Sequence, residues 1–403
     1  MKPKHRIVLL IYLSFWSLNL NGQQELNNDK IEPVSFIRHI GNAGISRGVT
    51  IEQIKGGGYI LTGYTTDGEH GGEDVFLIKT NSKGEPIWKK TFGGQGKDNG
   101  WAVRQTDDGG FIVVGYTDSF GNGGMDVYLI KTDFEGDTIW TKTYGGDGDE
   151  FGWDVRITED NGFIIAAQTN SQGNGEVDAY LIKVDKKGDE EWSNTYGGDK
   201  TDRVFSVQQT PDGGYVAVGI TYSYTSINQE DRDGYLLKTD PAGKQVWYKT
   251  FGNEAYDVAH SVTLNDDNGF LITGYGESFA KNGNRDLYLI KTDGFGESEW
   301  IKTYGGVEEE RGIKGQQTKD EGFVAIGFTS ENRDVYLIKT NSAGDTLWTR
   351  TYGEKDKVDF GYTVKETYDG GYVLVGHTAS FSGDEGSILL IKTDSEGLVK
   401  QRE

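Results

Sequence analysis

The sequence predicts an all-β protein, a seven-bladed β-propeller of four-stranded blades that is closed by an N-terminal strand completing the last blade. Three observations support this prediction. Versions of a D-x-Y-L-I-K-T motif recur seven times, at spacings of 48 to 55 residues. Gly accounts for 60 of the 403 residues and aromatic residues for 12%, a composition rich in turns and strands. The central apolar segments of each unit do not alternate with polar residues, as expected for strands buried on both faces.

A lysine and a tryptophan mark each repeat. The lysine of the L-I-K-T core falls at Lys79, Lys131, Lys183, Lys238, Lys291, Lys339 and Lys392. The tryptophan follows nine residues later at Trp88, Trp140, Trp192, Trp247, Trp300 and Trp348. The seventh such position holds Gln401, whereas Phe36 occupies the tryptophan position ahead of the first unit. We therefore expect the segment around Phe36 to supply the outer strand of the last blade and to close the ring.

Each unit is predicted to contain four short strands. In the second unit these are residues 102–106, 111–117, 127–132 and 138–144, separated by turns rich in Asp and Gly. The two middle strands are apolar on both faces, and the outer strand alternates, as expected where a blade meets water. An open solenoid is the alternative architecture, but it needs capping units that the sequence lacks.

The first residues are typical of an export signal. Lys2, Lys4 and Arg6 give a basic start, residues 7–20 are apolar, and a plausible cleavage site lies near Gly22. We predict a signal peptide over residues 1–22, a short linker over 23–32 and a single propeller domain over 33–403. The apolar run is shorter than the roughly 20 residues of a membrane span. The protein is therefore expected to be secreted, periplasmic or at the cell surface.

Composition also limits the partners. The formal net charge of -22 disfavours nucleic acid, which requires a basic face. The chain has no Cys, so disulfides and thiol chemistry are excluded. We expect a soluble monomer whose partner is a glycan or a surface or extracellular protein.

The loop between the second and third strands of each unit varies in length, whereas the connection to the next unit is nearly constant. Binding residues concentrate on variable loops held by a rigid scaffold. The longest such loop spans residues 221–233, and this loop and its equivalents carry aromatic residues at Tyr222, Tyr224, Phe120, Phe279 and Phe381. These rings could stack on sugar rings or cover an apolar partner surface, or they could wedge between adjacent blades.

The crossover between units carries an acid in six of them, at Asp98, Glu150, Asp202, Asp257, Glu310 and Asp359. Asp147, Asp149 and Glu150 form the densest group, and Ca²⁺ is the ion that such oxygen ligands would bind. Repetition in nearly every unit instead favours a turn carboxylate that accepts backbone N–H bonds. No cofactor is predicted, and Ca²⁺ is the one ion that the pattern admits.

Function in a repeat protein should lie where the units differ. At the start of the innermost strand, His260 replaces what is usually an aromatic or aliphatic residue. Asp154, His260, Arg311 and Lys314 are predicted to converge near the axis. A histidine beside a cation could remove a proton next to a carboxylate, the first step of uronate elimination, or it could be a packed core residue.

The repeat D-x-Y-L-I-K-T-D-x-x-G-x-x-x-W-x-K-T-Y-G-G, followed by D-G-G-[FY], resembles the β-propeller repeats of secreted bacterial and archaeal proteins. Its G-x-x-x-W portion, here Gly136 to Trp140, distantly resembles quinoprotein propellers. Quinoproteins have eight blades and dedicated cofactor residues without counterparts here, so no quinone is expected. Seven-bladed folds also include polysaccharide lyases, but no motif here matches one residue by residue.

Taken together, these features predict a non-enzymatic binding or scaffold protein that engages a glycan or protein partner through the loops on one face. The alternative is a polysaccharide lyase or another glycan-degrading enzyme with an axial site near His260. A scaffold for envelope or surface assembly is the third hypothesis.

Overall fold

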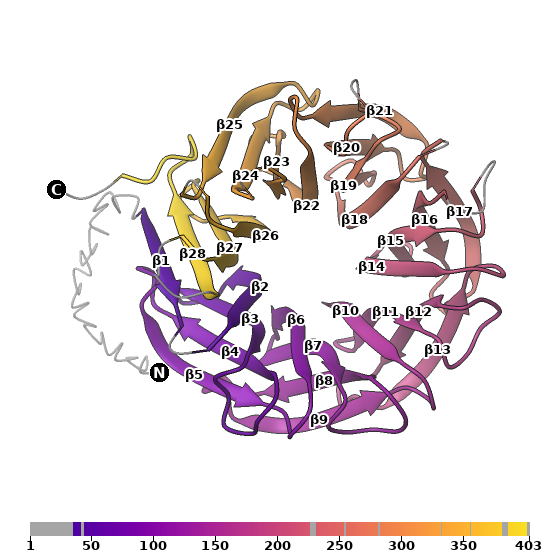
Figure 1. Cartoon of the computed structure of the whole chain (residues 1–403). Coiled ribbons are helices and arrows are strands. Elements are labelled where there is room, and N and C mark those ends of the chain that lie inside the picture. The colour runs from indigo at the N-terminus through magenta and orange to yellow at the C-terminus, as the bar shows by residue number, and fades with distance from the viewer. Residues whose placement is uncertain are drawn as a thin grey trace, which may run out of the picture. The chain divides into compact units, whose positions relative to one another are not determined.

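A computed structural model describes residues 35–41, 44–225, 231–253, 255–280, 283–331, 333–354, 356–380 and 386–400. Within these residues the strands form seven antiparallel sheets of four strands, arranged as blades around a central axis (Figure 1). The predicted seven-bladed propeller is therefore confirmed. In the described part of the chain, no helix has the length and apolar character needed to cross a membrane.

The strands are grouped here by their position in the blade. The innermost strands are β2 (Ser46–Gln53), β6 (Asp98–Gln105), β10 (Glu150–Ile157), β14 (Asp202–Gln209), β18 (Asp257–Leu264), β22 (Glu310–Gln317) and β26 (Asp359–Glu366). The second strands are β3 (Tyr59–Thr65), β7 (Phe111–Thr117), β11 (Phe163–Thr169), β15 (Tyr215–Thr221), β19 (Phe270–Gly276), β23 (Phe323–Thr329) and β27 (Tyr372–Thr378). The third strands are β4 (Asp74–Thr80), β8 (Asp126–Thr132), β12 (Asp178–Val184), β16 (Asp233–Thr239), β20 (Asp286–Thr292), β24 (Val335–Thr340) and β28 (Ser387–Thr393). The outer strands are β5 (Pro86–Phe92), β9 (Thr138–Tyr144), β13 (Glu190–Tyr196), β17 (Gln245–Phe251), β21 (Ser298–Tyr304), β25 (Thr346–Tyr352) and β1 (Phe36–Ile40).

Closure of the ring occurs as predicted. Strand β1 pairs with β28 in antiparallel register, from Phe36 opposite Lys392 to Ile40 opposite Ile388. Phe36 takes the tryptophan position: its ring lies 6.5 Å from that of Tyr59, as Trp88 lies 6.1 Å from Phe111 one blade further on. One sheet therefore contains both ends of the described chain (Figure 1).

The innermost strands begin earlier than the sequence indicated. Strand β6 starts at Asp98 rather than at residue 102, because the Gly-containing crossover already pairs with β7. The register shifts between Gly100 and Ala102, which leaves Trp101 in a bulge. Gly100 is required by close approach: a Cβ there would lie 2.6 Å from the Thr62 hydroxyl of the preceding blade. The bulge turns the position of Trp101 toward the axis. The regular alternation of side chains along a strand does not predict this orientation.

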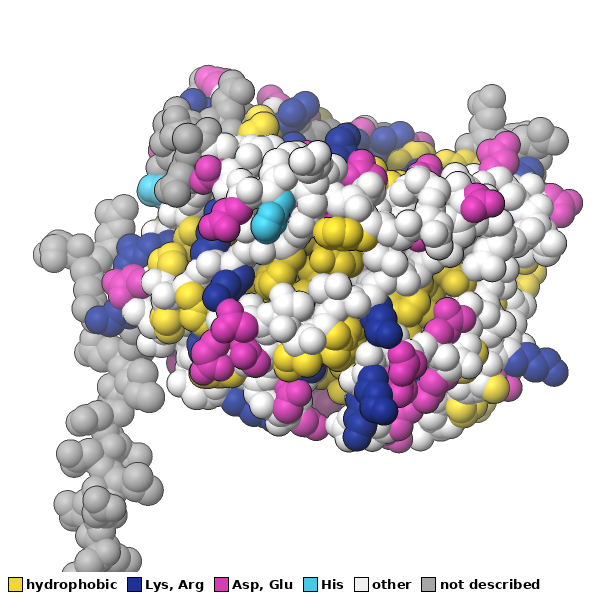
Figure 2. All heavy atoms as spheres, turned by 90° about the horizontal axis from the view of Figure 1, so that it is seen from below, with side chains coloured by type: hydrophobic (Ala, Val, Ile, Leu, Met, Phe, Trp, Pro, Cys, Tyr) yellow, Lys and Arg dark blue, Asp and Glu magenta, His cyan; other side chains and the backbone are white. Residues whose placement is uncertain are grey.

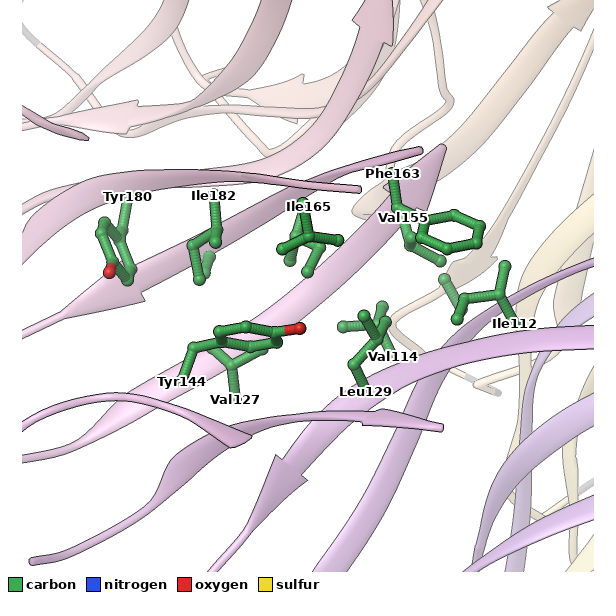
Figure 3. Close-up of a cluster of buried hydrophobic side chains, with 13 residues drawn as sticks. Ile112, Val114, Val127, Leu129, Tyr144, Val155, Phe163, Ile165, Tyr180 and Ile182 are labelled. Atoms are coloured by element: carbon green, nitrogen blue, oxygen red, sulfur yellow. The ribbon is translucent and has the colours of Figure 1, made fainter. Parts of the chain in front are cut away.

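Each pair of adjacent blades encloses a separate apolar core. Between the second and third blades, Val127 and Leu129 of β8 face Ile165 of β11 and Ile182 of β12, and all four are fully buried (Figure 3). The outer wall is different. Figure 2 shows its exposed apolar side chains interspersed with acidic and basic ones. The middle strands are therefore buried on both faces, and the outer strands are half exposed, as the sequence indicated.

An ion pair between a buried lysine and an aspartate in a turn explains why the two residue types recur together. Lys131 of β8 is almost fully buried, and its Nζ lies 3.0 Å from Asp108 in the turn between β6 and β7. The equivalent pair recurs in the five blades that follow, with N–O distances of 2.6 to 3.0 Å. The first blade has no acid in this turn, and Lys79 instead lies 3.0 Å above the ring centre of Phe134. The repeated motif is therefore scaffold.

Candidate functional site

A pocket of about 340 Å³ lies on the axis of the ring. Every innermost strand contributes to it. Its lining residues are Val49, Thr50, Trp101, Trp153, Asp154, Phe205, Ser206, His260, Ser261, Ile313, Lys314, Tyr362 and Thr363. Ring-bearing residues occupy the bulged positions of five blades, and we call these five, Trp101, Trp153, Phe205, His260 and Tyr362, the aromatic collar. The residue that follows the bulged position on each innermost strand is small or polar.

The collar is held by contacts between its own rings. Trp101 meets Trp153 edge to face at 4.6 Å, and Trp153 meets Phe205 at 6.1 Å. Phe205 stacks on His260 at 5.1 Å, so an unbroken arc of aromatic rings runs through four blades. The buried indole N–H of Trp153 has no hydrogen-bond partner among the described residues. That N–H is itself inaccessible, so what the collar offers to the pocket is its ring surfaces.

His260 lies within the collar, as predicted. Its imidazole stacks between Phe205 and Tyr275, at 5.1 and 6.1 Å between ring centres. Burial, together with the nearby charges of Arg232 and Lys314, lowers the pKa of His260 to about 4. The imidazole is therefore neutral at pH 7 but a weak base, since a general base works best with a pKa near the operating pH.

Asp154 also lines the pocket, but its carboxylate is fully engaged. Arg104 donates to it from Nη2 at 2.6 Å, and Arg156 Nη2 lies 3.1 Å from its other oxygen. Ser206 donates a further hydrogen bond at 3.1 Å. Although burial alone would raise it, the neighbouring cations Arg156, Arg104 and Lys314 hold the pKa of Asp154 at about 2. Asp154 is therefore a fixed anion and cannot transfer a proton near neutral pH.

Lys314 reaches the pocket without a partner. It makes no hydrogen bond or ion pair with the described residues, and its side chain is partly exposed to the pocket. Burial lowers the pKa of Lys314 well below its usual value, and the Arg104 and Arg156 charges lower it further, against the opposing effect of Asp154. Arg311 is the exception among the four predicted axial residues. It is absent from the pocket lining, forms an ion pair with Glu309 at 3.1 Å and lies 5.5 Å from the ring of Tyr275.

The axial residues that sequence reasoning missed lie two positions further along the innermost strands. Glu52, Arg104, Arg156 and Lys365 follow Thr50, Ala102, Asp154 and Thr363, and they form a second, charged layer. Arg104 bridges this layer, with its Nε 3.3 Å from Glu52 and its Nη2 2.6 Å from Asp154. A signal was present, because residues at i and i+2 of a strand share a face.

The predicted loop aromatics contact tyrosines of their own blades, and Tyr224 and Phe279 also pack on the apolar cores between adjacent blades. Tyr224 stacks on Tyr248 at 4.4 Å, while Phe120 and Phe279 lie 5.7 and 5.4 Å from the third-strand tyrosines of their own blades. Tyr222 is half-buried, with its hydroxyl 3.5 Å from Arg232. Phe120 keeps 45% of its surface exposed. Phe381 lies outside the described residues.

The repeated acids of the crossovers act on the backbone. Gly94 donates its N–H to Asp98 at 2.8 Å, and Gly146 donates to Glu150 at 2.7 Å. Asp149 accepts from the Met125 amide at 2.9 Å. Among the described residues, no group of three or more histidines and acids is placed to hold a metal ion, and this includes Asp147, Asp149 and Glu150.

Each crossover acid also lies close to the acid that opens the preceding third strand. At six blade junctions a single glycine separates the two carboxylates: Gly93, Gly145, Gly197, Gly252, Gly305 and Gly353. Burial raises the pKa of Asp126, Asp233 and Asp257 to about 6. For Asp126 and Asp233 the neighbouring carboxylate adds to the rise. These pairs recur around the ring, so they belong to the scaffold.

Comparisons with known proteins place the fold. No family model matches the chain, and no curated protein matches it. Among solved structures, a puromycin hydrolase aligns with a TM-score of 0.55 at 14% identity, over 87% of this chain and 52% of that one. The polysaccharide lyase Uly1 aligns with a TM-score of 0.53 at 12% identity, over 88% and 91% of the two chains. YCF48 bound to a D1 peptide aligns at 0.50 and 9%, over 90% and 96%. At these identities the likeness shows the fold alone.

Proposed function

We propose that this protein is a binding protein that takes a glycan, through one of its sugar rings, into the axial pocket. The observation that carries the proposal is the aromatic collar: five ring-bearing side chains from five blades surround one open pocket. The residues at the collar positions differ from blade to blade, whereas the residues of the blade cores repeat. The collar is therefore not dictated by the scaffold. A pocket of about 340 Å³ is in the range of small-ligand sites rather than of a folded partner.

A sugar ring packs its C–H face on an aromatic ring, and its hydroxyls form hydrogen bonds with polar groups. The collar supplies the aromatic rings, and Ser261 and Lys314 are polar residues that line the same pocket. The loop residues Tyr222, Tyr224, Phe120, Phe279 and Phe381 are proposed to contact parts of a longer glycan beyond the pocket. Export to the periplasm or cell surface, proposed from residues 1–22, would bring the protein to such glycans.

Tryptophan fluorescence tests this proposal, because two tryptophans line the pocket. Titration with neutral and acidic mono- and oligosaccharides is expected to change the emission saturably. Trp153→Ala should weaken binding by about 5- to 150-fold, if stacking of a sugar on the ring is worth the roughly 1–3 kcal/mol of a stacked base. Tyr368→Ala is the matched control, because this ring is 72% exposed and lies outside the pocket. Equal affinity of wild type and Trp153→Ala for every bound saccharide would refute the proposal.

The alternative activity, a polysaccharide lyase centred on His260, has weaker support. His260 is a weak base, Asp154 is locked by two arginines, and Arg311 lies outside the pocket lining. Incubation with uronate polysaccharides decides the matter: an ultraviolet-absorbing unsaturated product that wild type releases and His260→Ala does not would establish the lyase instead.

A further inference from the structure

The axial channel is cationic although the protein is acidic. Its two layers hold four cations, Arg104, Arg156, Lys314 and Lys365, against two carboxylates, Glu52 and Asp154. The difference of four and two is a local charge of +2 when all six groups are ionised, in a chain with a net charge of -22. This cluster lies in the interior of the ring, where water screens charge less than at the surface.

Both carboxylates form ion pairs with the two arginines. Arg104 lies 3.3 Å from Glu52 and 2.6 Å from Asp154, and Arg156 lies 3.1 Å from Asp154. Lys314 and Lys365 make no hydrogen bond or ion pair within the described residues, and both are half-buried. An unpaired cation in a protein interior is costly, so such groups are normally paired. Burial therefore disfavours the protonated form of Lys314, and an anion bound beside it would favour that form and pair with it.

The cations continue toward the loop face. Arg232 is close enough to His260 for its charge to lower the histidine pKa, and its guanidinium lies 3.2 Å from the ring centre of Tyr256. Arg285 lies 4.0 Å from the same ring. On an otherwise acidic molecule, a row of cations from Arg232 through Lys314 to Lys365 attracts anions to one place.

We propose that the ligand of the axial pocket carries an oxyanion, which is a carboxylate or a sulfate group. Lys314 binds this oxyanion, and Lys365, in the layer below, is the second cation. The inference rests on the proposed function, since it places the ring of the same ligand against the aromatic collar. The ligand class is therefore an acidic saccharide, either a uronate or a sulfated sugar. Lys314 is suited to the role because it lines the pocket beside Tyr362 and Ile313 while its amino group remains unpaired.

The test uses four probes: galactose, galacturonate, galactose 6-sulfate and inorganic sulfate. Calorimetry and thermal shift, in low-salt buffer free of phosphate and sulfate, compare wild type with Lys314→Met, Lys314→Arg, Trp153→Ala and Lys187→Met. We expect wild type to bind at least one of the two acidic sugars at least tenfold more tightly than galactose. Lys314→Met should lose this preference, Lys314→Arg should keep most of it, and the exposed control Lys187→Met should equal wild type. Far-ultraviolet circular dichroism confirms that each variant is folded.

The outcomes separate the two proposals. If galactose binds as tightly as both acidic sugars, or if Lys314→Met keeps the preference, the anion site at Lys314 is refuted and the proposal of glycan binding stands. If sulfate alone raises the melting temperature of wild type but not of Lys314→Met, relative to chloride at equal ionic strength, the anion site stands and the glycan proposal fails. If no probe binds or stabilises wild type, both are refuted.

Discussion

Replacement of Lys365 by Met should stabilise the protein at neutral pH. Burial and the charges of Arg156 and Arg104 lower the pKa of Lys365 from 10.5 to about 8, although Glu52 opposes the shift. Below pH 8 the lysine is protonated in the folded and unfolded states alike, and the folded state carries the full cost of the buried charge. Met retains most of the apolar stem and removes that charge.

The magnitude follows from the difference between the two pKa values. At about 1.36 kcal/mol per pH unit, a fall from 10.5 to about 8 corresponds to about 3 kcal/mol. Lys365 is partly open to the channel, so we expect about 1–2 kcal/mol. The sign of the pH dependence is fixed. Between pH 8 and 10.5 the unfolded state binds more protons at Lys365 than the folded state does, so the stability of wild type rises with pH relative to that of the variant.

Urea denaturation at pH 7, 8.5 and 10 measures this difference. Lys365→Met should have the higher midpoint at pH 7 with an unchanged m value, and its advantage should shrink at pH 10. The comparison cancels the ionisation of buried tyrosines, which both proteins share. Lys187→Met, on an exposed turn, should match wild type at every pH. A variant less stable than wild type at pH 7, or a difference independent of pH, would refute the assignment of Lys365 as an uncompensated cation.

Three further predictions concern the scaffold. Deletion of residues 33–42 removes β1 from the last sheet and should lower the melting temperature sharply in a thermal scan; an unchanged value would contradict ring closure. The raised pKa of Asp126 and Asp233, about 6, means that the folded state binds more protons at these two residues than the unfolded state between about pH 4 and 6. His260, whose pKa is lowered to about 4, acts in the opposite direction, so the comparison is made with a variant: in calorimetry Asp126→Asn should gain stability relative to wild type from pH 5 to pH 7.5. Gly136→Ala should lower the free energy of unfolding, measured by urea denaturation, by about 1–3 kcal/mol more than Gly109→Ala. Both glycines have a positive φ, but only at Gly136 would the added Cβ meet the tryptophan ring of the preceding blade, at 2.8 Å. Equal costs would contradict the blade packing.

The repeat predicted the fold because seven copies of one pattern fix both the number of blades and their register. The same property limited what could be read about the innermost strands. The bulge at Trp101 depends on the close approach of Gly100 to the preceding blade, which is a contact between units and leaves no local signal. The start of β6 was therefore placed four residues too late, although the bulged position itself was identified as variable.

Prediction of the candidate site was more limited. Asp154, His260 and Lys314 were expected near the axis from unit-to-unit differences, and they do line one pocket. Arg311 was grouped with them, but it lies before the bulge of its strand, outside the pocket lining, and its guanidinium pairs with Glu309. The pairing of two arginines with Asp154 depends on side-chain reach across the axis. Sequence spacing cannot reveal which cations such contacts leave unpaired.

The central claim is that an anion binds on the propeller axis beneath the aromatic collar. A crystal of the protein soaked in selenate, and measured at the selenium absorption edge, tests it most directly. We predict an anomalous peak within hydrogen-bonding distance of Lys314 Nζ, and its loss in Lys314→Met. Peaks confined to surface lysines and arginines, with none on the axis, would contradict the claim.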